Sequence, residues 1–340
     1  MIVTFGEVLL RLSPPNHRRF SQADTFEAYY GGAEANTAVS LCCLGEPARH
    51  VTRLPANDLG RACRGELARW GVDTSGISFE TAPDARLGLY FCESGVSQRP
   101  SRVIYDRKNS SFARWDHREL DWDALLEDAD WFHFTGITPA LGEELAAAAL
   151  EGCAASKKRG IPVSMDLNYR ANLWSKTQAG EVLSRYLEFV DVLFANNGSL
   201  ADVFGIDEEN SAVDNDPNAT LAAAREASRR FGIGEVALTM RQSISASCNQ
   251  WSALVYHGET GQHFLSQGYR MEIVDRIGGG DSFVAGLIYA KRRKFDHQHA
   301  VKFAAAASCL KHTIHGDVNP VTEQEVENLL ACGGAGLIQR

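Results

Sequence analysis

Short runs of β-branched and aromatic residues alternate with alanine-rich stretches through most of this chain. Trp131 to Thr135 and Val163 to Asp166 are typical of buried strands, and the stretch Leu141 to Arg159 between them has the length and composition of a helix. A strand, a helix and a second strand in this order form a βαβ unit, in which the two strands run parallel. The alternation predicts an α/β fold with a doubly wound, mainly parallel sheet sandwiched by helices.

The pattern extends towards both ends of the chain, so we expect one domain covering residues 1–340. With 44% hydrophobic residues, a chain of this length can bury a large core. The strands expected in the core are Ile2 to Gly6, Trp131 to Thr135, Val163 to Asp166, Val192 to Phe194 and Val236 to Thr239. The helices expected around them are Ala35 to Leu44, Leu141 to Arg159, Thr220 to Phe231, Ser282 to Arg292 and His299 to Leu310.

Two segments, at about 12–30 and 86–110, contain strand-like runs without helices between them. We expect these runs to form a small antiparallel sheet set apart from the main one. Ligands of parallel α/β sheets bind beyond the carboxyl ends of the strands, so the small sheet would form a lid over a binding site. The acidic, Asn-rich stretch from Asp207 to Asn218 is expected to be an exposed loop.

Charge and cysteine content argue against several classes of function. The net charge of -9 opposes nucleic-acid binding, which needs gathered basic residues. The eight cysteines form no C-x-x-C pair of the kind that binds zinc, and they are consistent with a reducing compartment. Neither a signal-like segment at Met1 to Glu7 nor an apolar window long enough for a membrane span is present. We therefore expect a cytoplasmic protein without nucleic-acid or membrane partners.

Three glycines, Gly278, Gly279 and Gly280, precede Asp281 and an apolar helical run. Free backbone N–H groups at the start of a helix favour an anion, and phosphoryl transfer needs such groups beside a carboxylate that accepts the proton of the nucleophile. Asp281 could be that base. Taken alone, the motif is equally consistent with a turn that caps a helix.

A second glycine motif runs from Tyr30 to Asn36 and opens another expected helix. The glycine pair would let the backbone approach a ligand closely, and Asn36 could offer both a donor and an acceptor to hydroxyl groups. Taken alone, this motif too is consistent with an ordinary turn. No P-loop and no strand-linked dinucleotide-binding motif is present.

Together, the two motifs resemble the two signatures of the ribokinase-like family of carbohydrate kinases. Runs between them, such as Arg86 to Phe91, Ser101 to Arg107, Phe134 to Leu141 and Asp166 to Arg170, are similar to 2-keto-3-deoxygluconate kinases. The similarity covers essentially the whole chain. The resemblance implies a kinase that uses ATP and Mg²⁺ to phosphorylate the 6-hydroxyl group of 2-keto-3-deoxygluconate, with Asp281 as the base and the three glycines as the anion hole.

The resemblance also implies which residues bind the ligands. The sugar-acid residues would be Gly32, Asn36, Tyr90, Tyr105, Arg107 and Arg170, and the nucleotide residues would be Asn196, Thr239 and Arg241. Arginine suits a substrate that carries a carboxylate, because its planar fork donates two parallel hydrogen bonds. Lid strands with exposed edges could also pair two chains in a homo-oligomer.

The chain departs from the family pattern on the nucleotide side. Relatives carry acidic residues directly after the position of Asn196, whereas here the run Asn196 to Ser199 has none before Asp202. Asp202 lies on a similar helical face and could replace them, or it could face solvent, so the metal-binding residues are left unassigned. Cys248 stands where relatives have an acidic residue.

Two alternatives therefore accompany the kinase hypothesis. One is a kinase of the same family for another sugar or sugar acid, and the other is a degenerate protein that binds a sugar acid with weak or no turnover.

Overall fold

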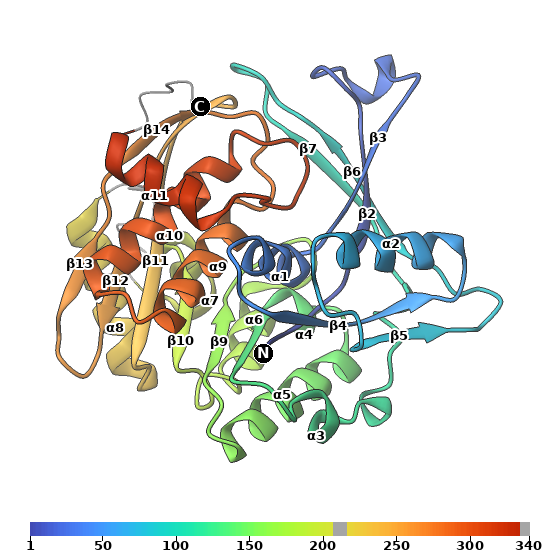
Figure 1. Cartoon of the computed structure of the whole chain (residues 1–340), viewed down its shortest axis with the longest axis horizontal. Coiled ribbons are helices and arrows are strands. Elements are labelled where there is room, and N and C mark those ends of the chain that lie inside the picture. Colours follow the sequence, from blue (N-terminus) through green and yellow to red (C-terminus); the bar gives the residue numbers. More distant parts are fainter. Residues whose placement is uncertain (207–215, 334–340) are drawn as a thin grey trace.

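The computed structural model of the chain describes residues 1–206 and 216–333. A large sheet between two layers of helices forms the body, and a smaller sheet stands against it at the upper right of Figure 1. The predicted α/β fold with a mainly parallel, helix-sandwiched sheet is confirmed. Most of the loop predicted from Asp207 to Asn218 lies outside the described residues, and a helix already begins at Pro217.

Ten strands of the described residues form the large sheet, in the order β13-β12-β11-β10-β9-β8-β1-β4-β5, with β14 also paired to β12. Their bounds are β1 Ile2–Phe5, β4 Ala48–Pro55, β5 Ile77–Glu80, β8 Trp131–Thr135, β9 Val163–Asp166, β10 Val192–Ala195, β11 Glu235–Ser245, β12 Cys248–His257, β13 His263–Leu265 and β14 Tyr269–Glu272. The strands from β11 to β5 in this order run parallel. The pairings of β12 with β11, β13 and β14 are antiparallel.

All five strands predicted for the core lie in the parallel part of this sheet. The parallel strands β4 and β5 and the antiparallel strands β12, β13 and β14 were not predicted, although β12 contains the apolar run from Trp251 to Tyr256. The end of β11 was also missed, where the strand continues past Thr239 into the polar run Arg241 to Ser245. That run has no apolar alternation, and only its pairing with β12 makes it a strand.

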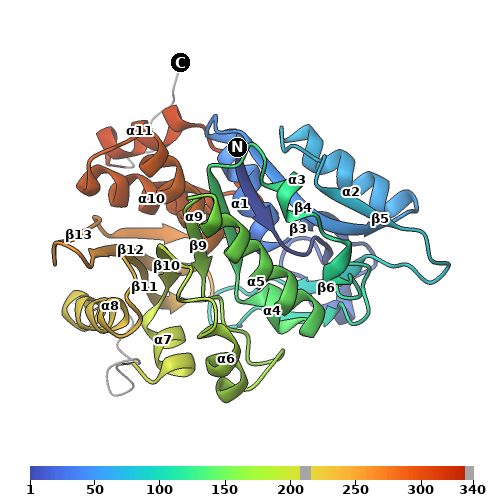
Figure 2. The same ribbon diagram turned by 90° about the horizontal axis from the view of Figure 1, so that it is seen from below.

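Helices cover both faces of the large sheet, as Figure 2 shows. Their bounds are α1 Ala33–Cys43, α2 Asp58–Arg69, α3 Trp122–Leu125, α4 Ile137–Ala140, α5 Glu143–Lys158, α6 Lys176–Leu183, α7 Asn197–Phe204, α8 Pro217–Phe231, α9 Gly279–Arg292, α10 His297–Lys311 and α11 Glu323–Cys332, with 3-10 turns η1 Phe20–Gln22 and η2 His117–Glu119. Ile2 of β1 packs in the core with α1, α9 and α10, whereas its neighbour Val3 packs in the core with α5, α6 and α8. Among the described helices, none combines the length and the hydrophobicity needed to span a bilayer.

The smaller sheet has the order β3-β2-β6-β7, and we call it the lid. Its strands are β2 Leu9–Ser13, β3 Glu27–Gly31, β6 Gly88–Glu93 and β7 Arg102–Asp106. The expectation that the lid is antiparallel throughout is corrected in one pairing, because β2 and β6 run parallel. Each of these two strands follows a parallel strand of the large sheet, β1 or β5, so both leave its carboxyl edge in the same direction.

A buried ion-pair cluster joins the lid to the body. Arg11 of β2 is 1% exposed, and its Nη1 lies 2.8 Å from Asp275 Oδ2 and 2.9 Å from Asp317 Oδ1. The hydroxyl group of Tyr90 on β6 donates to the other oxygen of Asp317. At its far end, the lid also meets the β11–β12 turn, where the Ala246 amide donates to the Ser97 carbonyl over 2.7 Å. The lid is therefore held at two places.

Candidate active site

A cavity of about 610 Å³ lies between the lid and the carboxyl ends of the parallel strands. The structure places every residue predicted for the site on its wall: Gly32, Asn36, Tyr90, Tyr105, Arg107, Arg170, Asn196, Thr239, Arg241, Gly278, Gly279, Gly280 and Asp281. The roles given to them remain predictions. The wall also includes residues that the sequence did not single out, among them Glu7, Glu34, Asp166, Arg276 and Asp317.

The three glycines form the turn that begins α9. Gly278 has φ 85°, a left-handed conformation that favours glycine, and a Cβ atom there would lie 1.9 Å from the Asp317 carbonyl oxygen. A Cβ atom on Gly279 would lie 2.3 Å from the His312 ring, whereas one on Gly280 would meet open space. The first amides of a helix have no partner within it, so this turn presents N–H groups to an anion.

Asp281 is bonded directly to the other glycine motif. The Asn36 amide donates to its Oδ2 over 2.7 Å, and the Thr37 hydroxyl group donates to its carbonyl oxygen over 3.4 Å. Burial raises the pKa of Asp281 to about 6, and the Asn36 bond and the positive charge of Arg170 oppose that rise. A carboxylate with this pKa is ionised at neutral pH and is basic enough to accept a proton from a bound hydroxyl group.

Two further carboxylates, the buried Glu34 and the half-buried Asp166, line the cavity with Asp281. Glu34 of α1 accepts hydrogen bonds from the Thr135 amide and the Thr138 hydroxyl group, at 3.0 and 2.8 Å, so it fastens α1 to the end of β8. Asp166 ends β9, and burial followed by the negative charge of Asp281 raises its pKa to about 7. Its position at the carboxyl end of a parallel strand was a signal available in the sequence.

On the lid side of the cavity, polar groups that were predicted to bind the sugar acid already have partners within the protein. The Tyr90 hydroxyl group is bonded to Asp317, and Tyr105 stacks on the Tyr90 ring with 5.7 Å between centroids. Arg107 donates from Nε to the buried Glu7 over 2.8 Å. Among the described residues, Arg170 has no carboxylate within ion-pair distance. A ligand carboxylate can therefore bind Arg170 without breaking an existing ion pair, as it would have to at Arg107.

The nucleotide residues lie beyond the ends of β10 and β11. Asn196 caps α7, because its side chain accepts from the Ser199 amide over 2.9 Å. Thr239 bonds weakly to the Ala195 carbonyl oxygen at 3.5 Å. Asp202, the candidate replacement for the missing acids, forms an ion pair with Lys176 at 2.5 Å. Part of its charge is therefore already compensated.

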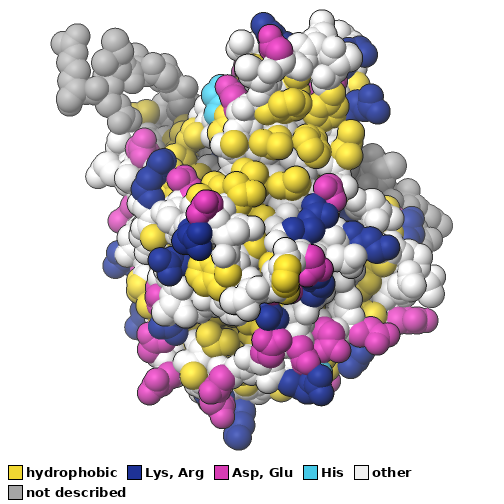
Figure 3. All heavy atoms as spheres, turned by 90° about the vertical axis from the view of Figure 1, so that its right-hand side faces the viewer, with side chains coloured by type: hydrophobic (Ala, Val, Ile, Leu, Met, Phe, Trp, Pro, Cys, Tyr) yellow, Lys and Arg dark blue, Asp and Glu magenta, His cyan; other side chains and the backbone are white. Residues whose placement is uncertain are grey.

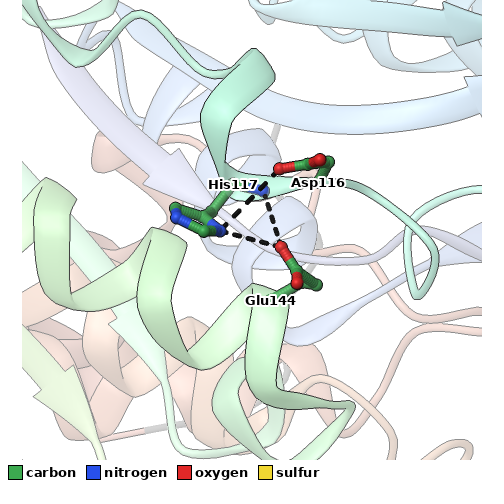
Figure 4. A group of neighbouring side chains, drawn as sticks. All are labelled: Asp116, His117 and Glu144. Carbon is green, nitrogen blue, oxygen red and sulfur yellow. Dashed lines mark hydrogen bonds and ion pairs between the residues drawn. The ribbon is translucent and has the colours of Figure 1, made fainter.

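Asp116, His117 and Glu144, between η2 and α5, are close enough together to hold a metal ion (Figure 4). They are not among the residues that line the cavity. His117 Nδ1 lies 2.8 Å from Glu144 Oε2, and this bond raises the pKa of the imidazole. The carboxylates around the imidazole favour its protonated form, and ion pairs between these partly exposed side chains account for the group.

The chain is similar to known proteins over nearly its whole length. Residues 1–324 match the family model described as pfkB family carbohydrate kinase. The chain is 34% identical to the 2-dehydro-3-deoxygalactonokinase of Haloferax volcanii, over 99% of this chain and 98% of that protein. The crystal structure of 2-dehydro-3-deoxygluconokinase from Thermotoga maritima superposes with a TM-score of 0.92 at 45% identity, covering 97% of this chain and 98% of that one. A putative ribokinase II from E. coli, in complex with ATP and Mg²⁺, shares the fold with a TM-score of 0.80 at 22% identity, covering 97% of this chain and 99% of that one.

The buried carboxyl group of Asp166 predicts a pH-dependent stability. Its pKa is raised from 3.8 to about 7, so at intermediate pH the folded chain keeps a proton that the unfolded chain has released. This contribution is fully present below about pH 4 and is lost as the pH rises through about 7. Asp166→Asn cannot ionise, so it should exceed the wild type in free energy of unfolding at pH 8, by on the order of 2 kcal/mol, and by less at pH 5.

Urea unfolding at pH 5 and pH 8 measures this difference. Glu259→Gln, which removes an exposed carboxyl group, is the control and should show the same small effect at both pH values. An advantage of Asp166→Asn that did not grow between pH 5 and pH 8 would contradict the prediction.

Proposed function

This chain belongs to the pfkB family of carbohydrate kinases, and we propose that it phosphorylates the 6-hydroxyl group of 2-keto-3-deoxygluconate with ATP. The observation that carries the proposal is the position of Asp281. A single cavity is lined by this buried carboxylate, the amides of the glycine turn and Arg170, which forms an ion pair with no carboxylate of the described residues. A base, an anion hole and a carboxylate-binding group are the parts that a sugar-acid kinase needs.

We propose the following roles for the residues of this chain. Asn36 holds the Asp281 carboxylate through its 2.7 Å bond, and Asp281 accepts the proton of the attacking hydroxyl group. The amides of Gly279 and Gly280 stabilise charge on the transferred phosphoryl group. Arg170 binds the carboxylate of the sugar acid, and Tyr90, Tyr105 and Arg107 close the sugar site from the lid. Mg²⁺, when bound with the nucleotide, would neutralise charge between its phosphates.

The carboxylates of the cavity are a limited set for holding Mg²⁺. Asp202 is paired with Lys176. Asn197 lines the cavity, and its buried Oδ1 has no hydrogen-bond partner among the described residues. Mg²⁺ in phosphoryl-transfer sites keeps several waters and is held largely by substrate phosphates. The residues present therefore fit a nucleotide-bound ion better than an ion held by the protein alone.

The 2-keto-3-deoxygalactonate epimer is the second candidate substrate, because the Haloferax volcanii relative is named for it and is 34% identical over nearly the whole chain. The two sugar acids differ in the configuration of one hydroxyl group, and both carry the same carboxylate. The proposed role of Arg170 holds for either of them.

A substrate panel tests the proposal. With ATP and Mg²⁺, we expect ADP release with 2-keto-3-deoxygluconate or its galactonate epimer, and at most weak release with fructose and ribose.

Arg170→Gln should raise KM for the sugar acid about 10- to 100-fold and leave KM for any neutral sugar unchanged. Coupled ADP-release kinetics measure both effects. A neutral sugar as best substrate would favour another kinase of the family, and no release with any compound would favour the binding-protein alternative.

The base assignment has its own test. Asp281→Asn keeps the shape and the contact with Asn36 but cannot accept the proton, so kcat should fall about 10²- to 10⁴-fold with ADP affinity preserved. The wild-type kcat should also rise with pH up to about 6, the pKa of Asp281, and then level off. Wild-type turnover by Asp281→Asn would rule out this base.

We also propose that two chains associate through the outer face of the lid. Val103 and Tyr105 of β7 line the cavity, so Ile104 between them lies on the opposite face. Ile104 is 51% exposed beside Phe91, which also contacts the rings of Phe20 and Phe26. Figure 3 shows hydrophobic side chains gathered over the side of the molecule that carries the lid. Exposed apolar patches of this kind often mark contacts between proteins.

Sedimentation velocity tests this association. The wild type should sediment as a dimer, and Ile104→Glu should shift it to the monomer by placing a charge in the contact. Leu265→Glu changes a residue of β13 with 39% exposure, at the edge of the large sheet opposite β5, and should leave the dimer intact. A monomeric wild type would refute the proposal.

A further inference from the structure

Two arginines, Arg241 and Arg276, face the cavity from the nucleotide side. Arg241 comes from the extended part of β11, and Arg276 lies two residues before the glycine turn. Arg276 donates from Nη2 to the Ala246 carbonyl oxygen over 2.6 Å, which fixes its guanidinium group beside the β11–β12 turn. Within the described ranges, neither arginine has a carboxylate at ion-pair distance.

Among the described residues, the surroundings of the two guanidinium groups supply little compensating negative charge. Burial and then the positive charge of Arg241 lower the pKa of Arg276. The neighbouring His312 is neutral at physiological pH, because burial lowers its pKa to about 4. Asp275, the nearest acid along the chain, is engaged by Arg11 at 2.8 Å. Two like charges on one cavity wall repel each other, and an anion between them would remove that repulsion.

The facing wall supplies little negative charge. The run from Asn196 to Ser199 is neutral, and the carboxylate of Asp202 is paired with Lys176. A wall rich in acids would attract Mg²⁺ and repel a bare phosphate, whereas this nucleotide side combines neutral amides with two arginines that no described carboxylate pairs. The donor set therefore favours direct binding of phosphate oxygens over recruitment of a metal ion by the protein.

We propose that Arg241 and Arg276 together bind the phosphate groups of the nucleotide directly, so that a nucleoside diphosphate binds to this chain without Mg²⁺. This inference rests on the proposed kinase function and adds Arg276 to the residues assigned to the nucleotide. Guanidinium groups suit the role, because each donates paired hydrogen bonds to phosphate oxygens.

Isothermal titration calorimetry of the full chain with ADP tests this inference, once in EDTA and once in Mg²⁺. The wild type should bind ADP in EDTA within about threefold of its affinity in Mg²⁺. Arg276→Gln and Arg241→Gln should each weaken ADP binding in EDTA about 10- to 100-fold, the range expected for loss of a charge-assisted hydrogen bond. Adenosine, which has no phosphate, should bind equally to all three proteins.

Arg270→Gln, on β14 and outside the cavity wall, is the matched control and should bind ADP as the wild type does. Titration with the sugar acid separates the two roles that a cavity arginine can have. If Arg276→Gln lost affinity for the sugar acid and kept it for ADP, Arg276 would belong to the sugar site and the inference would be wrong. ADP binding that required Mg²⁺ and ignored both variants would also overturn it, with the kinase function intact. No ADP binding under either condition would instead remove the kinase function itself.

Discussion

The buried charge cluster around Arg11 is the interaction on which the rest of the site depends. Arg11 reaches from the lid to Asp275 and Asp317, which lie on the two sides of the glycine turn. Lys311 is fully buried beside them and donates to the Ile314 carbonyl oxygen at 3.1 Å. The cluster thus contains two basic and two acidic side chains, all of them buried. Removal of one member would leave a buried charge without its partner.

This cluster also explains why the turn before α9 has its shape. The Gly278 backbone packs so closely on the Asp317 carbonyl group that no side chain fits between them, and the Lys311 stem lies 3.1 Å from the position that a Gly278 Cβ would occupy. The lid, through Arg11 and Tyr90, contacts the same Asp317. The position of the lid and the geometry of the anion hole therefore depend on shared atoms, which links the sugar site to the phosphate site.

Burial sets the chemistry of the carboxylates in the same way. Asp281, Asp166 and Glu34 all line the cavity, and desolvation raises the pKa of each carboxyl group, to about 6, 7 and 7 respectively. Their hydrogen bonds differ, however. Glu34 is enclosed by two threonines, whereas Asp281 has one amide partner and faces the cavity. A buried carboxylate thus holds a helix in one place and is available to a ligand in another.

Local patterns in the sequence predicted five of the parallel strands, five of the long helices and the two glycine motifs, whereas the parallel strands β4 and β5 were not predicted. Alternating apolar runs and glycine turns act over a few residues, so they are readable without the fold. The same reading found Asn36 and Asp281, which lie 245 positions apart and are bonded in the structure. It did not find β12, although the run from Trp251 to Tyr256 is apolar and of strand length.

Tertiary structure alone decided which charges are free. Arg107 and Arg170 look equivalent in the sequence, yet Glu7, one hundred residues before Arg107, pairs with the first and no described carboxylate pairs with the second. Arg276 was not singled out in the sequence, yet it lines the cavity. Asp202 was the candidate replacement for the missing acids, yet its carboxylate forms an ion pair with Lys176. The sequence by itself determined the fold and the position of the candidate base, because these follow from local patterning. The pairing of charges was decided by the folded chain, because ion pairs form between residues that only folding brings within a few ångströms of each other.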